Sequence, residues 1–162
     1  MRRSDKEISD EKIIELVLKE STVCHLAMAE DNVPYVLPMN FGYEEGIVYI
    51  HSATEGRKID LIGRNPRVCF QAESQVAICS DEVNACAWGT RYLSVIADGL
   101  ASIVEDNDEK KKALDIIMHK YSGRDGWDYK GESLAKIVII RIKLIGVKAK
   151  RSGWQIGELG PQ

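Results

Sequence analysis

Long hydrophobic runs are missing from this sequence. The longest apolar stretches, such as residues 137–140, are broken by charge within a few residues, whereas a membrane-spanning helix needs roughly 20 apolar residues. We therefore expect no membrane partner. The first residues, 1–7, carry charge but no apolar segment follows them, so export is not indicated and the cytoplasm is the expected location.

The sequence also lacks an excess of charge of either sign. It contains 22 lysine and arginine residues against 25 aspartate and glutamate residues, which gives a net charge of −3. A nucleic-acid-binding protein needs a concentrated basic surface to displace counterions. This balance argues against nucleic acid as a partner.

Cysteine and histidine are few and scattered. The four cysteines have no C-x-x-C spacing, and the three histidines, at positions 25, 51 and 119, do not form pairs at ligand spacing. Structural zinc sites need such short paired spacing, and cysteines in apolar strand-like runs behave as small packing residues. We expect reduced thiols and no metal site.

The composition is that of one ordinary globular domain. The 162 residues are 44% hydrophobic and 29% charged, close to the average for folded domains and too short a chain for two domains of usual size. No stretch rich in glycine, serine or proline divides them. The sequence predicts a single domain over residues 1–156 and a flexible tail over residues 157–162.

Three segments have helical periodicity, and most of the remainder is typical of β-strands. Helices are predicted over residues 10–20, 56–62 and 106–123, the last opening with a capping-box pattern. Strand-like runs cover residues 23–28, 35–43, 47–51, 68–72, 76–79, 92–104 and 136–144, and Gly99 marks a bend or bulge in the longest run. Six or seven strands in hairpin succession, with helices at the edges, predict a mainly-β (α+β) antiparallel barrel that is closed or half-closed.

The order of several motifs resembles a known family. The segments are YVLPMNFGY (35–43), YIHSA (49–53) leading into EGRKID (55–60), NPRVCF (65–70), RYLSV (91–95) followed by Gly99, VED (104–106) and HKY (119–121). In this order they resemble the pyridoxamine 5′-phosphate oxidase-like flavoproteins and, more narrowly, their 5-nitroimidazole-resistance branch. The resemblance covers about residues 5–150.

The resemblance implies a six- to seven-stranded split β-barrel that binds FMN, or FAD as an alternative, at the interface of a homodimer. It implies a flavin-dependent oxidoreductase that reduces a small-molecule electron acceptor, with nitroimidazoles and other nitroaromatics as one such class. A non-catalytic flavin- or haem-binding storage protein of the same fold is the alternative. The chain has no Gly-x-Gly-x-x-Gly fingerprint, so a nicotinamide donor would bind transiently at the flavin.

A flavin phosphate calls for cationic donors, and Gly56-Arg57-Lys58 places two cations where a helix begins. The plain alternative for Arg57 and Lys58 is a solvated helix turn. His51 ends an apolar strand directly before Ser52, and the resemblance places this motif near the flavin. His51 is the candidate catalytic residue, as a proton donor to the acceptor, or else a hydrogen-bonded structural residue.

The resemblance suggests further contacts with the flavin from two strands. Met39, Asn40 and Phe41 alternate around one strand, so Met39 and Phe41 share a face. The other candidate cofactor contacts are Trp88, Arg91, Tyr92 and Ser94. Members of the family often have Ser-Met-Arg where this chain has Gly89-Thr90-Arg91 after Trp88, and an aromatic residue before a strand is otherwise a core or interface anchor.

Overall fold

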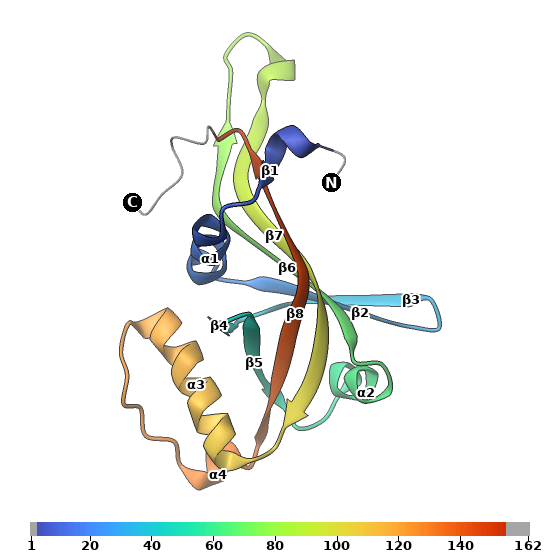
Figure 1. The fold of residues 1–162 in the computed structure, drawn as a ribbon, viewed down its shortest axis with the longest axis vertical. Helices are drawn as coiled ribbons and strands as arrows, with labels where there is room; N and C mark the ends of the chain where they lie inside the picture. The colour runs from blue at the N-terminus through green and yellow to red at the C-terminus, as the bar shows by residue number, and fades with distance from the viewer. Residues whose placement is uncertain (1–2, 155–162) are drawn as a thin grey trace.

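The computed structural model describes residues 3–154, in which eight strands form one antiparallel sheet with helices at its margins (Figure 1). The strands are β1 (Glu7–Ile8), β2 (Cys24–Glu30), β3 (Val33–Met39), β4 (Gly42–Glu44), β5 (Ile47–Ala53), β6 (Arg67–Cys79), β7 (Gly89–Val104) and β8 (Ile137–Ser152). The helices are α1 (Glu11–Glu20), α2 (Arg57–Arg64), α3 (Asn107–Ser122) and α4 (Gly131–Leu134), with 3-10 turns η1 (Ser4–Lys6) and η2 (Ala85–Ala87). The predicted tail, 157–162, lies outside the described residues.

The sheet is open and strongly twisted. Its strand order is β3-β2-β6-β7-β8-β5-β4, with β1 added to β8, so β3 and β4 lie at the two ends of the path. The longest pairing joins β7 to β8, from Tyr92 opposite Ser152 to Val104 opposite Ile139. This arrangement confirms the predicted mainly-β antiparallel split barrel with peripheral helices.

The strand boundaries differ from the prediction at several strands: β1 is not among the predicted strands, β7 begins at Gly89, and β8 continues to Ser152 rather than ending at residue 144. Two further differences have a specific structural cause. The predicted strands 68–72 and 76–79 are one strand, β6, because a bulge between Ser74 and Ala77 absorbs the polar residues that separate them. Gln75 in this bulge has a φ of 52°. The predicted strand 35–43 is instead divided into β3 and β4, since the backbone N–H of Phe41 donates to the Tyr121 hydroxyl rather than to a neighbouring strand.

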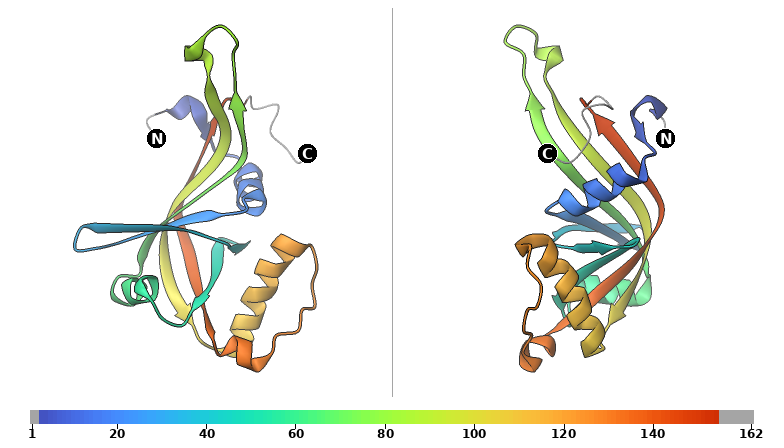
Figure 2. Two further views of the ribbon diagram at one scale, coloured as in Figure 1. Left: turned by 180° about the vertical axis from the view of Figure 1, so that it is seen from behind. Right: turned by 60° about the vertical axis from the view of Figure 1, so that its left-hand side comes forward.

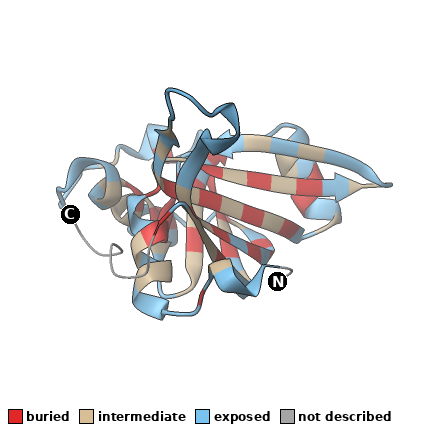
Figure 3. Ribbon diagram, turned by 90° about the horizontal axis from the view of Figure 1, so that it is seen from above, coloured by how far each residue is buried: buried red, intermediate tan, exposed pale blue. Residues whose placement is uncertain are grey.

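The main core lies between the sheet and α1, and buried residues alternate with less buried ones along β2, β5, β6 and β7 (Figure 3). Phe41 and Phe70 pack edge to face with their ring centroids 5.4 Å apart. A smaller cluster of Val104, Ala113 and Ile139 lies beneath α3. The two longest helices therefore cover different parts of the sheet, and burial of these apolar faces supplies most of the folding free energy.

Local capping fixes where the helices begin and end. Asp106 accepts the backbone N–H groups of Asp108 and Glu109 at the start of α3, as the capping-box pattern predicts. The helix ends at Gly123, whose φ of 64° is in the left-handed region that favours glycine. At α2, the helix stops at Arg64 because Pro66 follows.

The hairpin of β6 and β7 extends beyond the body of the molecule as an arm (Figure 2). The turn between these strands contains η2, and the Trp88 indole N–H donates to the carbonyl of Asp81 across it at 2.7 Å. Val83 at the end of the arm is 97% exposed. The arm therefore presents apolar side chains that its own chain does not cover.

Gly99 in β7 allows the sheet to pack closely, and its replacement is expected to destabilise the fold. A Cβ at this position would lie 2.6 Å from Cγ2 of Ile142 and 2.9 Å from Cγ2 of Val68. We expect Gly99→Ala to lower the free energy of unfolding by about 1–3 kcal/mol in urea denaturation, because overpacking a buried site costs about this much. Gly63→Ala is the control, since a Cβ there meets nothing within 4 Å and alanine favours the helix. Equal stability of the two variants would contradict the packing argument.

Candidate functional site

Two cations begin α2, directly after the strand that carries His51. Gly56 precedes them with a φ of 118°, in the left-handed region that glycine tolerates, and it turns the chain from β5 into α2. The Arg57 guanidinium lies 4.5 Å from the centroid of the Tyr35 ring on β3. Within residues 3–154, neither Arg57 nor Lys58 forms an ion pair. Their charge is available to an anion.

His51 and Ser52 lie just before the end of β5, on opposite faces of the sheet. Ser52 is 4% exposed, and its Oγ has no hydrogen-bond partner within the described part of the chain. A buried hydroxyl without a partner is costly, and such groups often mark a place for a ligand or a water molecule. His51 lies opposite Ile139 of β8 and its side chain is exposed. The structure therefore places His51, Ser52, Arg57 and Lys58 on one short stretch.

Met39, Asn40 and Phe41 form the junction between β3 and β4. Met39 is half-buried, Asn40 is exposed, and Phe41 is fully buried in the main core. The predicted contact of Phe41 with a cofactor therefore has no free side-chain surface in this structure. Asn40 is exposed, whereas the backbone N–H of Phe41 already donates to the Tyr121 hydroxyl.

The remaining candidates lie on the arm. Trp88 is 56% exposed next to η2, and the Arg91 guanidinium lies 4.4 Å from the centroid of the Trp154 ring. Tyr92 and Ser94 line a cavity of about 330 Å³ together with Gln71, Glu73 and Val76. Within a single chain, the predicted site residues therefore lie in three separate places. These are the end of β5 with the start of α2, the β3–β4 junction, and the arm.

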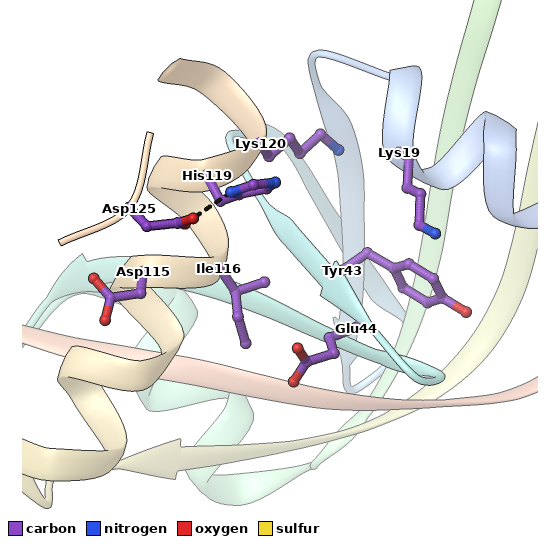
Figure 4. Close-up of a pocket in the computed structure, with 8 residues that line it drawn as sticks. All are labelled: Lys19, Tyr43, Glu44, Asp115, Ile116, His119, Lys120 and Asp125. Carbon is purple, nitrogen blue, oxygen red and sulfur yellow. Dashed lines mark hydrogen bonds and ion pairs between the residues drawn. The ribbon is translucent and has the colours of Figure 1, made fainter. Parts of the chain in front are cut away.

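Two larger cavities lie against α3 and contain none of the predicted residues. One of about 680 Å³ lies between α1, β4 and α3 (Figure 4), and one of about 590 Å³ lies between α3 and strands β5, β7 and β8. The first contains the pair His119–Asp125, with Nδ1 and Oδ1 2.8 Å apart. Among the residues that the structure describes, no group of three or more His, Cys, Asp or Glu side chains could hold a metal ion.

Three functional candidates escape prediction from the sequence. Tyr35 supports Arg57, and Lys120 and Tyr121 contact the β3–β4 junction. Burial lowers the pKa of Lys120 to about 7. Nothing in the helical periodicity of α3 separates Lys120 from the exposed lysines around it, since only the position of α1 decides that it is half-buried.

The sequence profile of pyridoxamine 5′-phosphate oxidase matches residues 10–151. The match spans all the helices of the structure and the strands from β2 to all but the last residue of β8, and so includes the three groups of candidate residues. The chain belongs to the pyridoxamine 5′-phosphate oxidase family. The resemblance found in the motifs is thereby confirmed. No curated protein matches the chain at a significant level.

Solved structures of this oxidase family's fold agree with the assignment. A proposed 5-nitroimidazole antibiotic resistance protein from Bacteroides thetaiotaomicron VPI-5482 is 30% identical, with a TM-score of 0.78, and the match covers 90% of this chain and 86% of that one. An FAD-binding protein from Mesorhizobium loti is 26% identical, with a TM-score of 0.67 and coverage of 91% and 98%. The FAD and heme binding protein from Mycobacterium smegmatis, at 15% identity, has a TM-score of 0.78 with coverage of 92% and 74%, and shows the fold alone.

None of the helices in residues 3–154 is long and apolar enough to cross a membrane.

Proposed function

We propose that this protein is a flavin-dependent oxidoreductase that binds FMN, or FAD as the alternative, between two copies of the chain. The observation that carries the proposal is the pair of cations Arg57 and Lys58, which form no ion pair among the described residues and begin the helix that follows Ser52 in the chain, whose buried Oγ has no hydrogen-bond partner in the same part of the structure. The FAD-binding relative from Mesorhizobium loti supports the same cofactor class.

The residues at the start of α2 fit a flavin phosphate. An arginine fork can donate to two phosphate oxygens, while a lysine acts as a point charge. The Ser52 hydroxyl can donate to a further acceptor, and the first N–H groups of α2 have no partner within the helix. Tyr35 beneath Arg57 holds the guanidinium in place. These groups bind and orient the cofactor; a bound flavin supplies the electron or hydride transfer itself.

A second copy of the chain would complete the site. Trp88 follows η2, and Tyr92 and Ser94 lie on β7. The arm of β6 and β7 extends away from α2 in the same chain (Figure 2), so a homodimer would bring these residues to the flavin of the other copy. The arm and the adjoining face of the sheet carry exposed apolar side chains, which mark interaction surfaces when they gather. These are Val76, Ile78, Val83, Trp88, Ile96, Leu100, Ile145 and Val147.

The acceptor that we propose is a small electrophile, with a 5-nitroimidazole as the first candidate. The 30% identical relative from Bacteroides thetaiotaomicron VPI-5482 supports this class. Electrons would come from a nicotinamide that binds transiently at the flavin. We further propose that the protein acts in the cytoplasm as a single domain.

The absorption spectrum of the purified protein, with and without added FMN, is the first test. Flavin bands, with FMN or FAD released on heating and identified by mass, would support the proposal. A Soret band would favour the haem-binding alternative, and a colourless protein that takes up no flavin would refute the cofactor assignment. The reaction is tested next, in the absence of oxygen. The reduced flavin of the protein should be reoxidised faster when a 5-nitroimidazole is added than in buffer alone.

His51 is expected to affect the reaction but not cofactor binding. Its exposed imidazole, on β5 six residues before Arg57, can donate a proton to the acceptor as it is reduced, a role worth about 10²–10⁴ in rate. We expect His51→Ala to slow anaerobic reoxidation by a 5-nitroimidazole at least about tenfold while the Kd of FMN changes less than about threefold. His25→Ala is the control, because His25 bonds to Gln71 elsewhere on the sheet. Equal rates in the two variants would assign His51 a structural role.

A further inference from the structure

The cavity of about 590 Å³ between α3 and the sheet has a floor of directly opposed residues from three strands. Tyr49 on β5 and Ser102 on β7 both pair with Arg141 of β8. Residues that lie directly opposite each other point to the same face of a sheet, so these three side chains face α3 together. Their neighbours Ile140 and Ile142 are fully buried in or beside the main core on the other face. The cavity therefore lies outside the main core.

Apolar side chains line the cavity beside this row. Val104 is 8% exposed and Ala113 on α3 is 2% exposed, and Ile47 and Ile103 complete the apolar lining. Pockets for small ligands are mostly apolar clefts of about 300–1,000 Å³ with a few convergent polar groups. The size and lining of this cavity suit a small, flat compound.

Arg141 contributes a positive charge to the cavity without an acidic partner. Its side chain is partly buried, and within residues 3–154 it forms no ion pair. The other cation of the lining, Lys112 on α3, lies 4.0 Å from a carboxylate oxygen of Glu44. A partly buried charge is screened less than an exposed one, and the planar fork of arginine matches a carboxylate. Arg141 is therefore the group of this cavity best suited to bind a carboxylate.

Three acidic residues line the cavity where β7 leads into α3. Asp106 already accepts two backbone N–H groups as the cap of α3. Glu105 and Glu109 are exposed and form no ion pair in the described part of the chain. Glu105 follows Ser102 by three residues, which is about 10 Å of extended chain. The cavity thus has a positive end at Arg141 and a negative end at the start of α3.

We propose that this cavity binds a zwitterion, an aromatic ring that carries a carboxylate at one end and an ammonium group at the other. The carboxylate binds the Arg141 guanidinium through charge-assisted hydrogen bonds, and the ring lies between Tyr49 and Val104. The ammonium group faces Glu105 and Glu109. None of the residues assigned to the flavin lines the cavity, so this inference does not rest on the proposed function.

Three related compounds test the two ends of the cavity in the wild-type protein. 4-(Aminomethyl)benzoate carries both charges, 4-(aminomethyl)benzamide lacks the carboxylate, and 4-methylbenzoate lacks the ammonium group. In ¹⁵N NMR titrations we expect the zwitterion to bind at least about tenfold more tightly than the amide. It should bind about two- to fivefold more tightly than 4-methylbenzoate, since exposed carboxylates contribute less.

The same titrations locate the ligand. The largest shifts should occur at the backbone amides of Tyr49, Ser102 and Ala113, which line the cavity. Equal affinities of the zwitterion and the amide, or shifts centred on another part of the chain, would overturn the proposal.

Variants of β8 assign the carboxylate end. Arg141→Met should bind the zwitterion and the amide alike, and Arg141→Lys, which keeps the charge without the planar fork, should retain part of the preference. Lys143→Met is the matched control, because Lys143 lies on the same face of β8 but does not line the cavity. It should keep the wild-type preference. A preference that survives in Arg141→Met would overturn the assignment, and the ligand comparison in the wild type decides the proposal even if that variant does not fold.

Added FMN separates this site from the proposed flavin site. Saturating FMN should change the Kd of 4-(aminomethyl)benzoate less than about threefold. Displacement of the zwitterion by FMN would place the cavity within the flavin site and overturn the inference. A protein that binds the zwitterion but takes up no FMN would refute the proposed function and leave this inference standing.

Discussion

Replacing Arg57 and Lys58 together with alanine is expected to raise the Kd of FMN by about 10²–10⁴. Hydrogen bonds to charged groups contribute about 1.5–3 kcal/mol each, and every 1.4 kcal/mol is a tenfold change in affinity. Both side chains begin α2 without ion-pair partners among the described residues, so nothing else in that part of the chain competes for their charge. Fluorescence quenching of FMN on titration with the flavin-free protein measures the effect.

A matched double variant separates a specific phosphate contact from a general loss of charge. Arg64 ends the same helix and pairs with Glu30, and Lys111 lies on the exposed side of α3. Arg64→Ala with Lys111→Ala removes the same net charge and should change the Kd of FMN less than about threefold, because distant surface charges are screened. Riboflavin, which lacks the phosphate, should bind the wild type and the Arg57/Lys58 variant alike. An unchanged FMN affinity in that variant would remove the phosphate site from consideration.

Replacing Ile96 with glutamate is expected to dissociate the proposed dimer and to release its flavin. Ile96 is 47% exposed on β7, in line with Leu100 on the same face of the sheet. In a homodimer formed through this face the new carboxylate would be buried without a partner, which costs about 2–4 kcal/mol. Because a homodimer would bury two such carboxylates, the dimer dissociation constant should rise by about 10³–10⁶. Light scattering coupled to gel filtration measures the mass, and absorbance at the flavin bands measures the cofactor retained.

Lys111→Glu is the control for the dimer experiment, because it places the same carboxylate on an exposed part of α3. It should remain a dimer with its flavin bound. If Ile96→Glu also remained a dimer, the face of β7 would not be the interface. If it became a monomer that still bound FMN with wild-type affinity, the arm of the second copy would make no contribution to the site.

The secondary structure of this chain follows closely from local sequence patterns, except where residues far away in the sequence form the hydrogen bonds of a segment. The capping pattern at Asp106 and the left-handed glycine at position 123 define α3 because both act within one turn. The division of residues 35–43 into two strands depends on Tyr121, a residue about eighty positions away. The continuity of β6 across residues 73–76 depends on a bulge in its pairing with β7. Local patterns carry no information about either long-range partner.

The candidate site shows the same distinction. Arg57 and Lys58 could be assigned to a phosphate from the sequence, since helix starts attract anions and the motif carries two cations. Three other features could not be predicted from the sequence. They are the contact of Tyr35 with Arg57, the unpartnered hydroxyl of Ser52 and the burial of Lys120. Each is a contact between segments that only the folded sheet brings together.

The sequence by itself determined the family, the antiparallel β-rich class and the places of α1, α2 and α3, because these depend on motif order, hydrophobic period and short-range capping. The tertiary structure alone decided that Phe41 belongs to the core, that Trp88 lies on an arm apart from Arg57, and that Lys120 reaches the C-terminus of α1. The burial of a side chain, and whether its charge is paired, depend on contacts between segments that are far apart in the sequence. A local pattern determines which residue types are present, but not which of them come into contact.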